Sequence, residues 1–147
     1  MTVHLLYVCT GNATRSFLAE AYTRARRPDW QVESAGTLVI PGTVTSRRTR
    51  AAFEAIALEV PPHTSRQLEE AMLARADLVL GFEPMHLDYV RRVHPQYLDR
   101  MMLLDHPDPE GGDEAVFRDT ALAIRASIDS LLRTWEQAPP GPVHPPR

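Results

Sequence analysis

Hydrophobic and polar residues follow one another along this chain of 147 residues in patterns that predict strands and helices in turn. Short apolar runs predict strands at 3–8, 30–35, 77–82 and 100–104. Apolar residues at helical spacing predict helices at 16–27, 46–57, 67–75, 84–93 and 113–135. We therefore expect an α/β fold: a single-domain, open, mainly parallel four-stranded sheet with helices on both faces. In such a sheet ligands bind beyond the carboxyl ends of the strands.

The first predicted strand leads directly into the sequence CTGNATRS at residues 9–16. Gly11 and Asn12 permit the sharp turn that bends a loop into a cradle, and Ser16 can cap the helix that follows. The backbone N–H groups of residues 10–15 would then converge on one point beside a helix N-terminus, which favours an anion. The sequence thus predicts a phosphate-binding loop after the first strand.

Cys9 and Arg15 give this loop its candidate chemistry. The field of a helix N-terminus and a nearby cation favours the thiolate of Cys9, which is a nucleophile, and the Ser16 hydroxyl can donate to it. Arg15 carries a planar guanidinium that matches two phosphate oxygens. The competing interpretation is a buried structural cysteine. The predicted phosphate-binding residues are Thr10, Gly11, Asn12, Ala13, Thr14, Arg15 and Ser16.

Composition indicates one globular domain over residues 1–137, followed by a proline-rich tail at 138–147 that we expect to be disordered. A single cysteine excludes an intramolecular disulfide, and neither a secretory signal nor a membrane-length apolar run is present, so we expect a cytoplasmic protein without a membrane partner. The net charge is −3 and the arginine clusters fall on predicted helices, which argues against nucleic acid. The histidines lack the spacings typical of metal sites, so we expect neither a metal nor a cofactor. We expect His106 to be exposed. Composition leaves the oligomeric state open.

Together these residues resemble the low-molecular-weight protein tyrosine phosphatases, whose signature is a short strand, then C-x-G-N-x-x-R-S and a helix containing Ala-Glu. The resemblance continues in order at Ser34-Ala35-Gly36-Thr37, His63-x-Ser65-Arg66, Ala76-Asp77-Leu78-Val79-Leu80 and Asp108-Pro109. It implies a metal-independent phosphatase that acts through a cysteinyl-phosphate, with Cys9 as nucleophile. Its partners would be a phosphorylated protein or a small phosphomonoester.

The general acid is the least determined residue of the predicted site. Asp105, Asp108 and Asp113 all follow the fourth predicted strand, and a turn aspartate is an equally good interpretation of local sequence. The resemblance selects Asp108, because the acid of the family is followed by proline just before the last helix.

Several positions depart from the common family pattern and leave the substrate open. Thr14 replaces a second cysteine, Glu110 replaces an aromatic residue, and the loop 38–42 lacks a tryptophan. Glu110 either pairs with a substrate guanidinium or points into solvent. The short loop and the pattern Asp108-Pro109-x-Gly111-Gly112 are similar to protein arginine phosphatases, although Ala13 stands where these typically have threonine.

Two further classes remain as alternatives. A small-thiol-coupled arsenate reductase would need only one cysteine, and a non-catalytic phosphate-binding module would use the loop to sense an anion. The combination of Cys9, Arg15, Ser16 and Asp108 favours catalysis.

Overall fold

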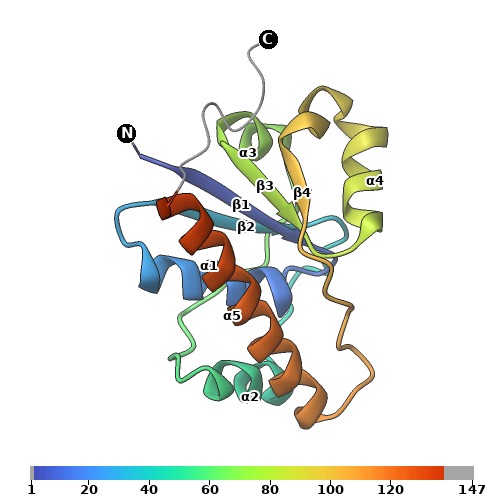
Figure 1. The fold of residues 1–147 in the computed structure, drawn as a ribbon. Coiled ribbons are helices and arrows are strands. Elements are labelled where there is room, and N and C mark those ends of the chain that lie inside the picture. The colour runs from blue at the N-terminus through green and yellow to red at the C-terminus, as the bar shows by residue number, and fades with distance from the viewer. Residues whose placement is uncertain (1, 138–147) are drawn as a thin grey trace.

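A computed structural model describes residues 2–137, and its centre is a parallel sheet of four strands. The strands are β1 (His4–Cys9), β2 (Gln31–Gly36), β3 (Leu78–Gly81) and β4 (Met101–Leu103), in the order β2-β1-β3-β4. In the register of β1 and β2, Cys9 lies opposite Gly36. Because every strand runs in the same direction, their carboxyl ends share one edge, and Cys9 stands on that edge (Figure 1).

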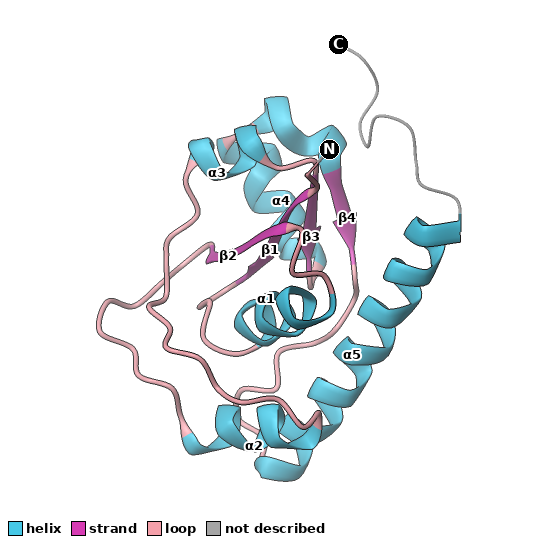
Figure 2. Cartoon of the chain, turned by 90° about the vertical axis from the view of Figure 1, so that its left-hand side faces the viewer, coloured by secondary structure: helices cyan, strands magenta, loops and turns pink. Residues whose placement is uncertain are grey.

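Helices cover both faces of the sheet, as predicted. Figure 2 shows α1 (Arg15–Arg26) and α5 (Glu114–Gln137) on one side of the strands, with α2 (Arg47–Ala55) packed against α5. On the other side lie α3 (Glu70–Arg75) and α4 (Pro84–Val93). The expected three-layer α/β architecture is therefore confirmed.

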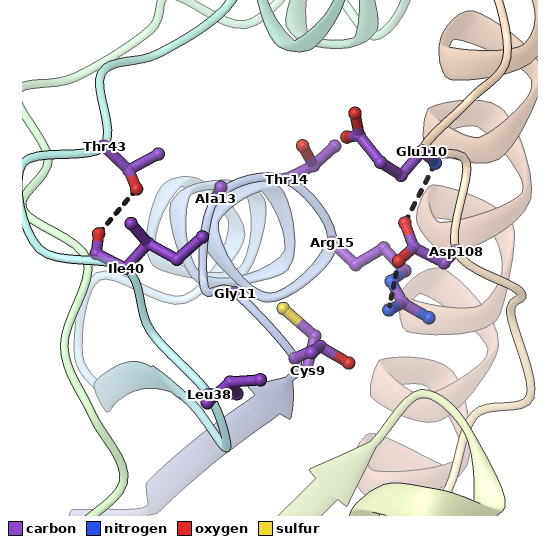
Figure 3. Close-up of a pocket in the computed structure, with 11 residues that line it drawn as sticks. Cys9, Gly11, Ala13, Thr14, Arg15, Leu38, Ile40, Thr43, Asp108 and Glu110 are labelled. Carbon is purple, nitrogen blue, oxygen red and sulfur yellow. Dashed lines mark hydrogen bonds and ion pairs between the residues drawn. The ribbon is translucent and has the colours of Figure 1, made fainter.

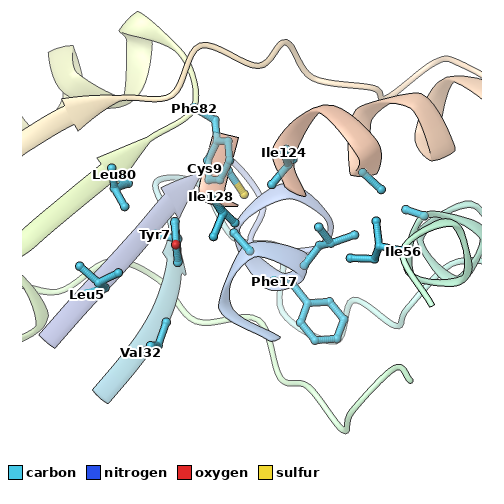
Figure 4. Packing of buried hydrophobic residues seen from close by; sticks show 14 of the residues in the cluster. Leu5, Tyr7, Cys9, Phe17, Val32, Ile56, Leu80, Phe82, Ile124 and Ile128 are labelled. Carbon is cyan, nitrogen blue, oxygen red and sulfur yellow. The ribbon is translucent and has the colours of Figure 1, made fainter. Parts of the chain in front are cut away.

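Side chains of β1 alternate between two hydrophobic cores, because successive residues of a strand point to opposite faces. Leu5, Tyr7 and Cys9 join the larger core with α1, α2 and α5 (Figure 4). Leu6 and Val8 join the smaller core with α3 and α4. Every one of these five side chains is at most 3% exposed, so the strand that ends in Cys9 is anchored on both sides.

Several predicted boundaries are wrong. Helix α1 begins at Arg15, so Ser16 lies inside the helix and does not cap it. Residues 67–69 are not helical, because Leu68 donates to the Gly36 carbonyl and Arg66 accepts from Gly36, which draws this segment along β2. A short 3-10 helix, η1 (Pro95–Arg100), was not predicted. The predicted disordered tail at 138–147 lies outside the described residues. Within residues 2–137, no helix combines the length and apolarity needed to cross a bilayer.

Candidate active site

The carboxyl edge of the sheet carries a pocket of about 410 Å³ at the end of β1. Its walls come from the β1–α1 loop (residues 10–14), from the loop after β2, and from the β4–α5 loop (residues 104–113). In Figure 3, Leu38, Ile40 and Thr43 form one side and Asp108 and Glu110 the other, with Cys9 between them. The full lining is Cys9, Thr10, Gly11, Ala13, Thr14, Arg15, Leu38, Ile40, Thr43, Asp108 and Glu110. The fold thus brings the three predicted catalytic residues to one pocket.

The β1–α1 loop has the backbone that a phosphate cradle requires. Asn12 has a φ of 53°, the left-handed conformation that reverses the chain. Within the part of the chain that the structure describes, the N–H groups of residues 11–15 donate to no protein acceptor, which leaves them available to an anion. Gly36 permits the loop to close: a Cβ there would lie 2.4 Å from the Thr10 carbonyl oxygen. The glycine of Ser34-Ala35-Gly36-Thr37 is therefore a packing requirement of the loop.

A buried hydrogen-bond chain directs a proton toward the Cys9 sulfur. The Oδ1 atom of Asn12 accepts from the Arg66 backbone N–H at 2.9 Å, which fixes the orientation of the amide. Its Nδ2 group consequently donates to Ser16 Oγ at 2.7 Å and to Ser34 Oγ at 2.9 Å. Ser16 Oγ lies 2.9 Å from Cys9 Sγ, and when Cys9 is a thiolate, which has no hydrogen, the Ser16 hydroxyl must be the donor.

Ser34 completes this chain on the far side of Asn12. Its hydroxyl donates to Glu20 Oε1 at 2.6 Å, so it can only accept from the Asn12 amide. Asn12 and Ser16 are fully buried, and their side chains do not line the pocket. These two predicted phosphate-binding residues therefore have side chains that lie beneath the loop. Asn12 supports the shape of the loop, and Ser16 contacts the Cys9 sulfur.

The main-chain carbonyl of Asn12 is held from a third segment. His63 Nε2 donates to it at 2.7 Å and Ser65 Oγ at 2.9 Å. The imidazole also stacks on Phe17 of α1, with ring centroids 3.8 Å apart and planes 7° from parallel. All three residues of the sequence pattern His63-x-Ser65-Arg66 therefore make hydrogen bonds to Asn12 and stabilise its left-handed turn.

Arg15 is almost completely buried, and protein groups orient its guanidinium. Its Nη1 group donates to Glu83 Oε1 at 2.6 Å and to the carbonyl of His106 at 2.9 Å. Its Nη2 group lies 3.7 Å from Asp108 Oδ2. Only 2% of the Arg15 side chain is exposed, so its remaining donors face the pocket in a site of low dielectric. Glu83 was not predicted as a site residue.

Asp108 is the aspartate of the β4–α5 loop that lines the pocket. Its side chain is 50% exposed, and its Oδ1 accepts from the Glu110 N–H at 2.9 Å. Asp113 instead caps α5, because its Oδ1 accepts from the Val116 N–H at 3.1 Å. Asp105 has a φ of 57° and does not line the pocket. Geometry therefore favours Asp108 among the three aspartates.

Glu110 has a partner that was not predicted, and its pairing with a substrate guanidinium stays a prediction. It lines the pocket, yet its Oε1 already pairs with Nη2 of Arg48 at 3.0 Å. Its side chain is 67% exposed, so the pair lies at the pocket mouth in contact with water. A substrate cation at this position would share the carboxylate with Arg48.

Two histidines support the pocket walls. His86 Nδ1 accepts from the N–H groups of Phe82 and Glu83, so its proton is on Nε2 and is donated to Thr10 Oγ1 at 3.0 Å. Burial, with the nearby Arg15 cation, lowers the pKa of His86 to about 4. His106, expected to be exposed, is half-buried and bonds Ser127 at 2.8 Å. Burial lowers the pKa of His106 as well.

No cluster of three or more His, Cys, Asp or Glu side chains suited to a metal occurs within residues 2–137. The groups of the pocket that could take part in chemistry are its thiol, its guanidinium, its backbone N–H groups and its carboxylates.

Comparison with known proteins agrees with this geometry. Residues 4–138 match the family model described as low molecular weight phosphotyrosine protein phosphatase. The chain is 31% identical over 140 residues to the low molecular weight protein-tyrosine-phosphatase Wzb of Escherichia coli K12, covering 92% of this chain and 94% of that protein. It is 33% identical over 144 residues to a protein-arginine-phosphatase of Bacillus subtilis, covering 88% and 91%.

A solved structure of similar fold is a mutant of the YwlE arginine phosphatase in which serine replaces cysteine and the active-site serine is phosphorylated. It superimposes with a TM-score of 0.84 at 25% identity and covers 92% of this chain and 97% of that chain. This structural similarity agrees with the family match over nearly the whole sequence. The chain belongs to the low molecular weight phosphotyrosine protein phosphatase family and is a phosphatase.

Proposed function

We propose that this phosphatase hydrolyses phosphomonoesters of the phosphotyrosine type through a cysteinyl-phosphate intermediate at Cys9. In this proposal Arg15 and the N–H groups of the β1–α1 loop bind the phosphoryl oxygens, and Asp108 is the general acid and base. The Ser16 hydroxyl stabilises the thiolate. No metal takes part in the steps that follow.

In the first step the Cys9 thiolate attacks phosphorus, forming an S–P bond while the bond from phosphorus to the leaving oxygen breaks. Asp108 transfers its proton to that oxygen, so that the alcohol or phenol leaves uncharged. Negative charge on the equatorial oxygens is met by the guanidinium of Arg15 and by the loop N–H groups, which are already oriented before reaction. The contacts of the Arg15 guanidinium with Glu83 and the His106 carbonyl supply that orientation.

In the second step a water molecule attacks phosphorus and the S–P bond breaks. The Asp108 carboxylate, deprotonated by the first step, takes the proton of the water, and inorganic phosphate and the Cys9 thiolate result. One aspartate therefore serves as acid and then as base, and the enzyme returns to its starting protonation state.

The observation that carries the proposal is the chain from Asn12 to Ser16 to Cys9. The Arg66 N–H fixes the Asn12 amide, the amide donates to Ser16, and the Ser16 hydroxyl lies within hydrogen-bond distance of the sulfur, where it can donate to a thiolate. A structural cysteine in a hydrophobic core needs no such donor. The phosphorylated active-site serine of the YwlE mutant supports the same position as the point of phosphoryl transfer.

Phosphate release from p-nitrophenyl phosphate tests this function. The wild-type protein should turn over without added metal and in the presence of a chelator, and Cys9→Ser should lose turnover while still binding vanadate. Arsenate reduction is measured in parallel with a small thiol. Reduction without phosphatase activity would favour the arsenate reductase alternative, and anion binding with neither activity would favour a sensing module.

A second candidate function is that of a protein arginine phosphatase. Glu110 in the pocket wall and the Gly111-Gly112 turn of the β4–α5 loop favour it, as does the similarity to a protein-arginine-phosphatase. Competition between phosphotyrosine and phosphoarginine peptides distinguishes the two, since the preferred substrate will have the higher kcat/KM. We expect a phosphorylated protein or small phosphomonoester as partner, and the cytoplasm remains the expected location.

A further inference from the structure

The first turn of α2 touches both loops that form the pocket. Its N-terminal cap, Ser46, accepts from the Thr49 N–H at 3.0 Å, which fixes the start of the helix. Thr49 Oγ1 lies 2.7 Å from Thr14 Oγ1 in the β1–α1 loop. Arg48, the preceding residue, reaches across to the β4–α5 loop. Two neighbouring side chains thus connect the loop of the nucleophile with the loop of Asp108.

Arg48 contacts the β4–α5 loop at two points and the helix that follows it at a third. Its Nη2 donates to Glu110 Oε1 at 3.0 Å, and its Nη1 donates to the Gly112 carbonyl at 2.9 Å. Its guanidinium carbon lies 5.1 Å from the centre of the Phe117 ring at the start of α5. A planar guanidinium can bond two acceptors and stack at once, which an ammonium group cannot do.

The loop that carries Asp108 has few other polar contacts near its tip. Asp108 itself is half exposed and accepts from the Glu110 N–H, while its distance of 3.7 Å to Arg15 is a weak ion pair. Gly111 has a φ of +93°, and a glycine pair gives this backbone many alternative conformations. The segment between Asp108 and Gly112 therefore depends on side chains from outside the loop for a fixed conformation.

We propose that Arg48 is a positioning residue for the reaction: by binding Glu110 and Gly112 it holds the loop in the conformation that turns Asp108 toward Cys9. The proposal rests on the role of Asp108 as general acid. Arg48 is absent from the pocket lining, so it acts through the loop. The same proposal gives a role to the ion pair between Glu110 and Arg48 at the pocket mouth.

Arg47 provides a matched control on the same helix. It is exposed, and within residues 2–137 its side chain makes no hydrogen bond or ion pair. Replacing either arginine by methionine removes one positive charge from the same turn of α2, and methionine retains an unbranched stem that can still pack on Phe117. Differences between Arg48→Met and Arg47→Met therefore report the contacts of Arg48 and not the net charge.

The first measurement is kcat/KM for two aryl phosphates that differ in leaving group. Arg48→Met should reduce it about 10-fold or more for phenyl phosphate, whose leaving group needs the acid, and less than about 3-fold for p-nitrophenyl phosphate. Arg47→Met should match wild type on both. Glu110→Gln, which weakens the same contact from the loop side, should give a smaller selective loss. An equal loss on both substrates in Arg48→Met, or no loss, would overturn the proposal.

The second measurement does not depend on activity. Amide hydrogen exchange at Glu110 and Gly112, whose N–H groups bond Asp108 and the Pro109 carbonyl, should be faster in Arg48→Met than in Arg47→Met. Equal exchange rates in the two variants would overturn the proposal that Arg48 holds the loop, even if activity fell. A wild-type protein without phosphatase activity would contradict the proposed function instead, and the exchange result would still decide whether Arg48 holds the loop.

Discussion

The sulfur of Cys9 lies 2.9 Å from the hydroxyl oxygen of Ser16, which itself accepts from the amide of Asn12. A thiolate has no hydrogen, so in the reactive form of Cys9 the serine must donate to the sulfur. A hydrogen bond from a neutral donor to a charged acceptor is stronger than one between neutral groups. The pair therefore stabilises the reactive form of the nucleophile.

Removing that donor should slow catalysis without unfolding the protein. Ser16→Ala should lower kcat/KM by about 10-fold to 100-fold, the range expected for a lost hydrogen bond to a charged group. Alkylation of Cys9 by iodoacetamide at neutral pH should slow as well, because the thiolate that reacts has lost its hydrogen-bond donor. Ser130→Ala, an exposed site on α5, is the control. Alkylation at the wild-type rate would show that Ser16 does not stabilise the sulfur.

Loss of the general acid should depend on the leaving group. Asp108→Ala should reduce kcat/KM by roughly 10² to 10⁴ for phenyl phosphate and by less for p-nitrophenyl phosphate. Asp105→Ala should be close to wild type. Asp113→Ala should lower stability by about 1 kcal/mol through the lost cap of α5, with little change in leaving-group dependence. A larger selective loss in Asp105→Ala would transfer the acid role to that residue.

Two substitutions of Glu110 should change the substrate preference, one by removing its charge and the other by also adding an aromatic ring. Glu110→Gln removes the anion and should lower efficiency toward phosphoarginine peptides, if the carboxylate shared with Arg48 also meets the substrate. Glu110→Tyr adds a ring and should in addition raise efficiency toward phosphotyrosine peptides through stacking. The measurement is the ratio of kcat/KM for the two peptides. A ratio unchanged in both variants would leave Glu110 as a partner of Arg48 alone.

Acid should destabilise the protein through His86. Burial lowers its pKa to about 4, and the unfolded chain has an ordinary histidine. Between about pH 6.5 and pH 4 the unfolded state binds a proton that the folded state does not, so stability falls as the pH is lowered through this window. Protonation at Nδ1 also removes the acceptor of the Phe82 and Glu83 N–H groups.

Urea unfolding at pH 7 and pH 4.5 measures this effect. His86 should account for a loss of up to about 3 kcal/mol over the full window. His86→Gln should be less stable than wild type at pH 7, yet should lose less on acidification because it has no proton to bind. An equal loss in both proteins would assign the acid sensitivity to other groups.

The sequence predicted those parts of the protein that depend on local pattern. The strand from His4 to Cys9 and the apolar stripe of α5 follow from apolar spacing. Cys9, Arg15 and Asp108, which the resemblance implied as catalytic residues, line one pocket, and their roles stay predictions. Serine is a common helix cap, and Ser16 was therefore predicted to cap α1. In the structure it lies inside α1 and contacts Asn12 and Cys9, and propensity rules for single residues do not predict such contacts.

Contacts between distant segments were not predictable. Glu83 lies 68 positions from Arg15, and its importance appears only when β3 and α4 bring it beside the guanidinium. The segment at 67–69 has helical propensity, but pairing with Gly36 overrides it. Arg48 and Glu110 are 62 positions apart; the sequence indicated a solvated surface charge for Arg48 and either a substrate contact or a solvent-exposed side chain for Glu110. Only the tertiary fold brings these two side chains together as an ion pair.

Trapping the phosphoenzyme is the most direct test of covalent catalysis at Cys9. Asp108→Ala should still react with p-nitrophenyl phosphate, whose leaving group needs little acid, but should lack the base for the second step. Stopped-flow mixing should therefore release a burst of about one p-nitrophenolate per active site. Mass spectrometry of the quenched protein should find one phosphoryl group on the peptide that contains Cys9. Steady release of phosphate without a burst, and with no phosphate on Cys9, would contradict the account.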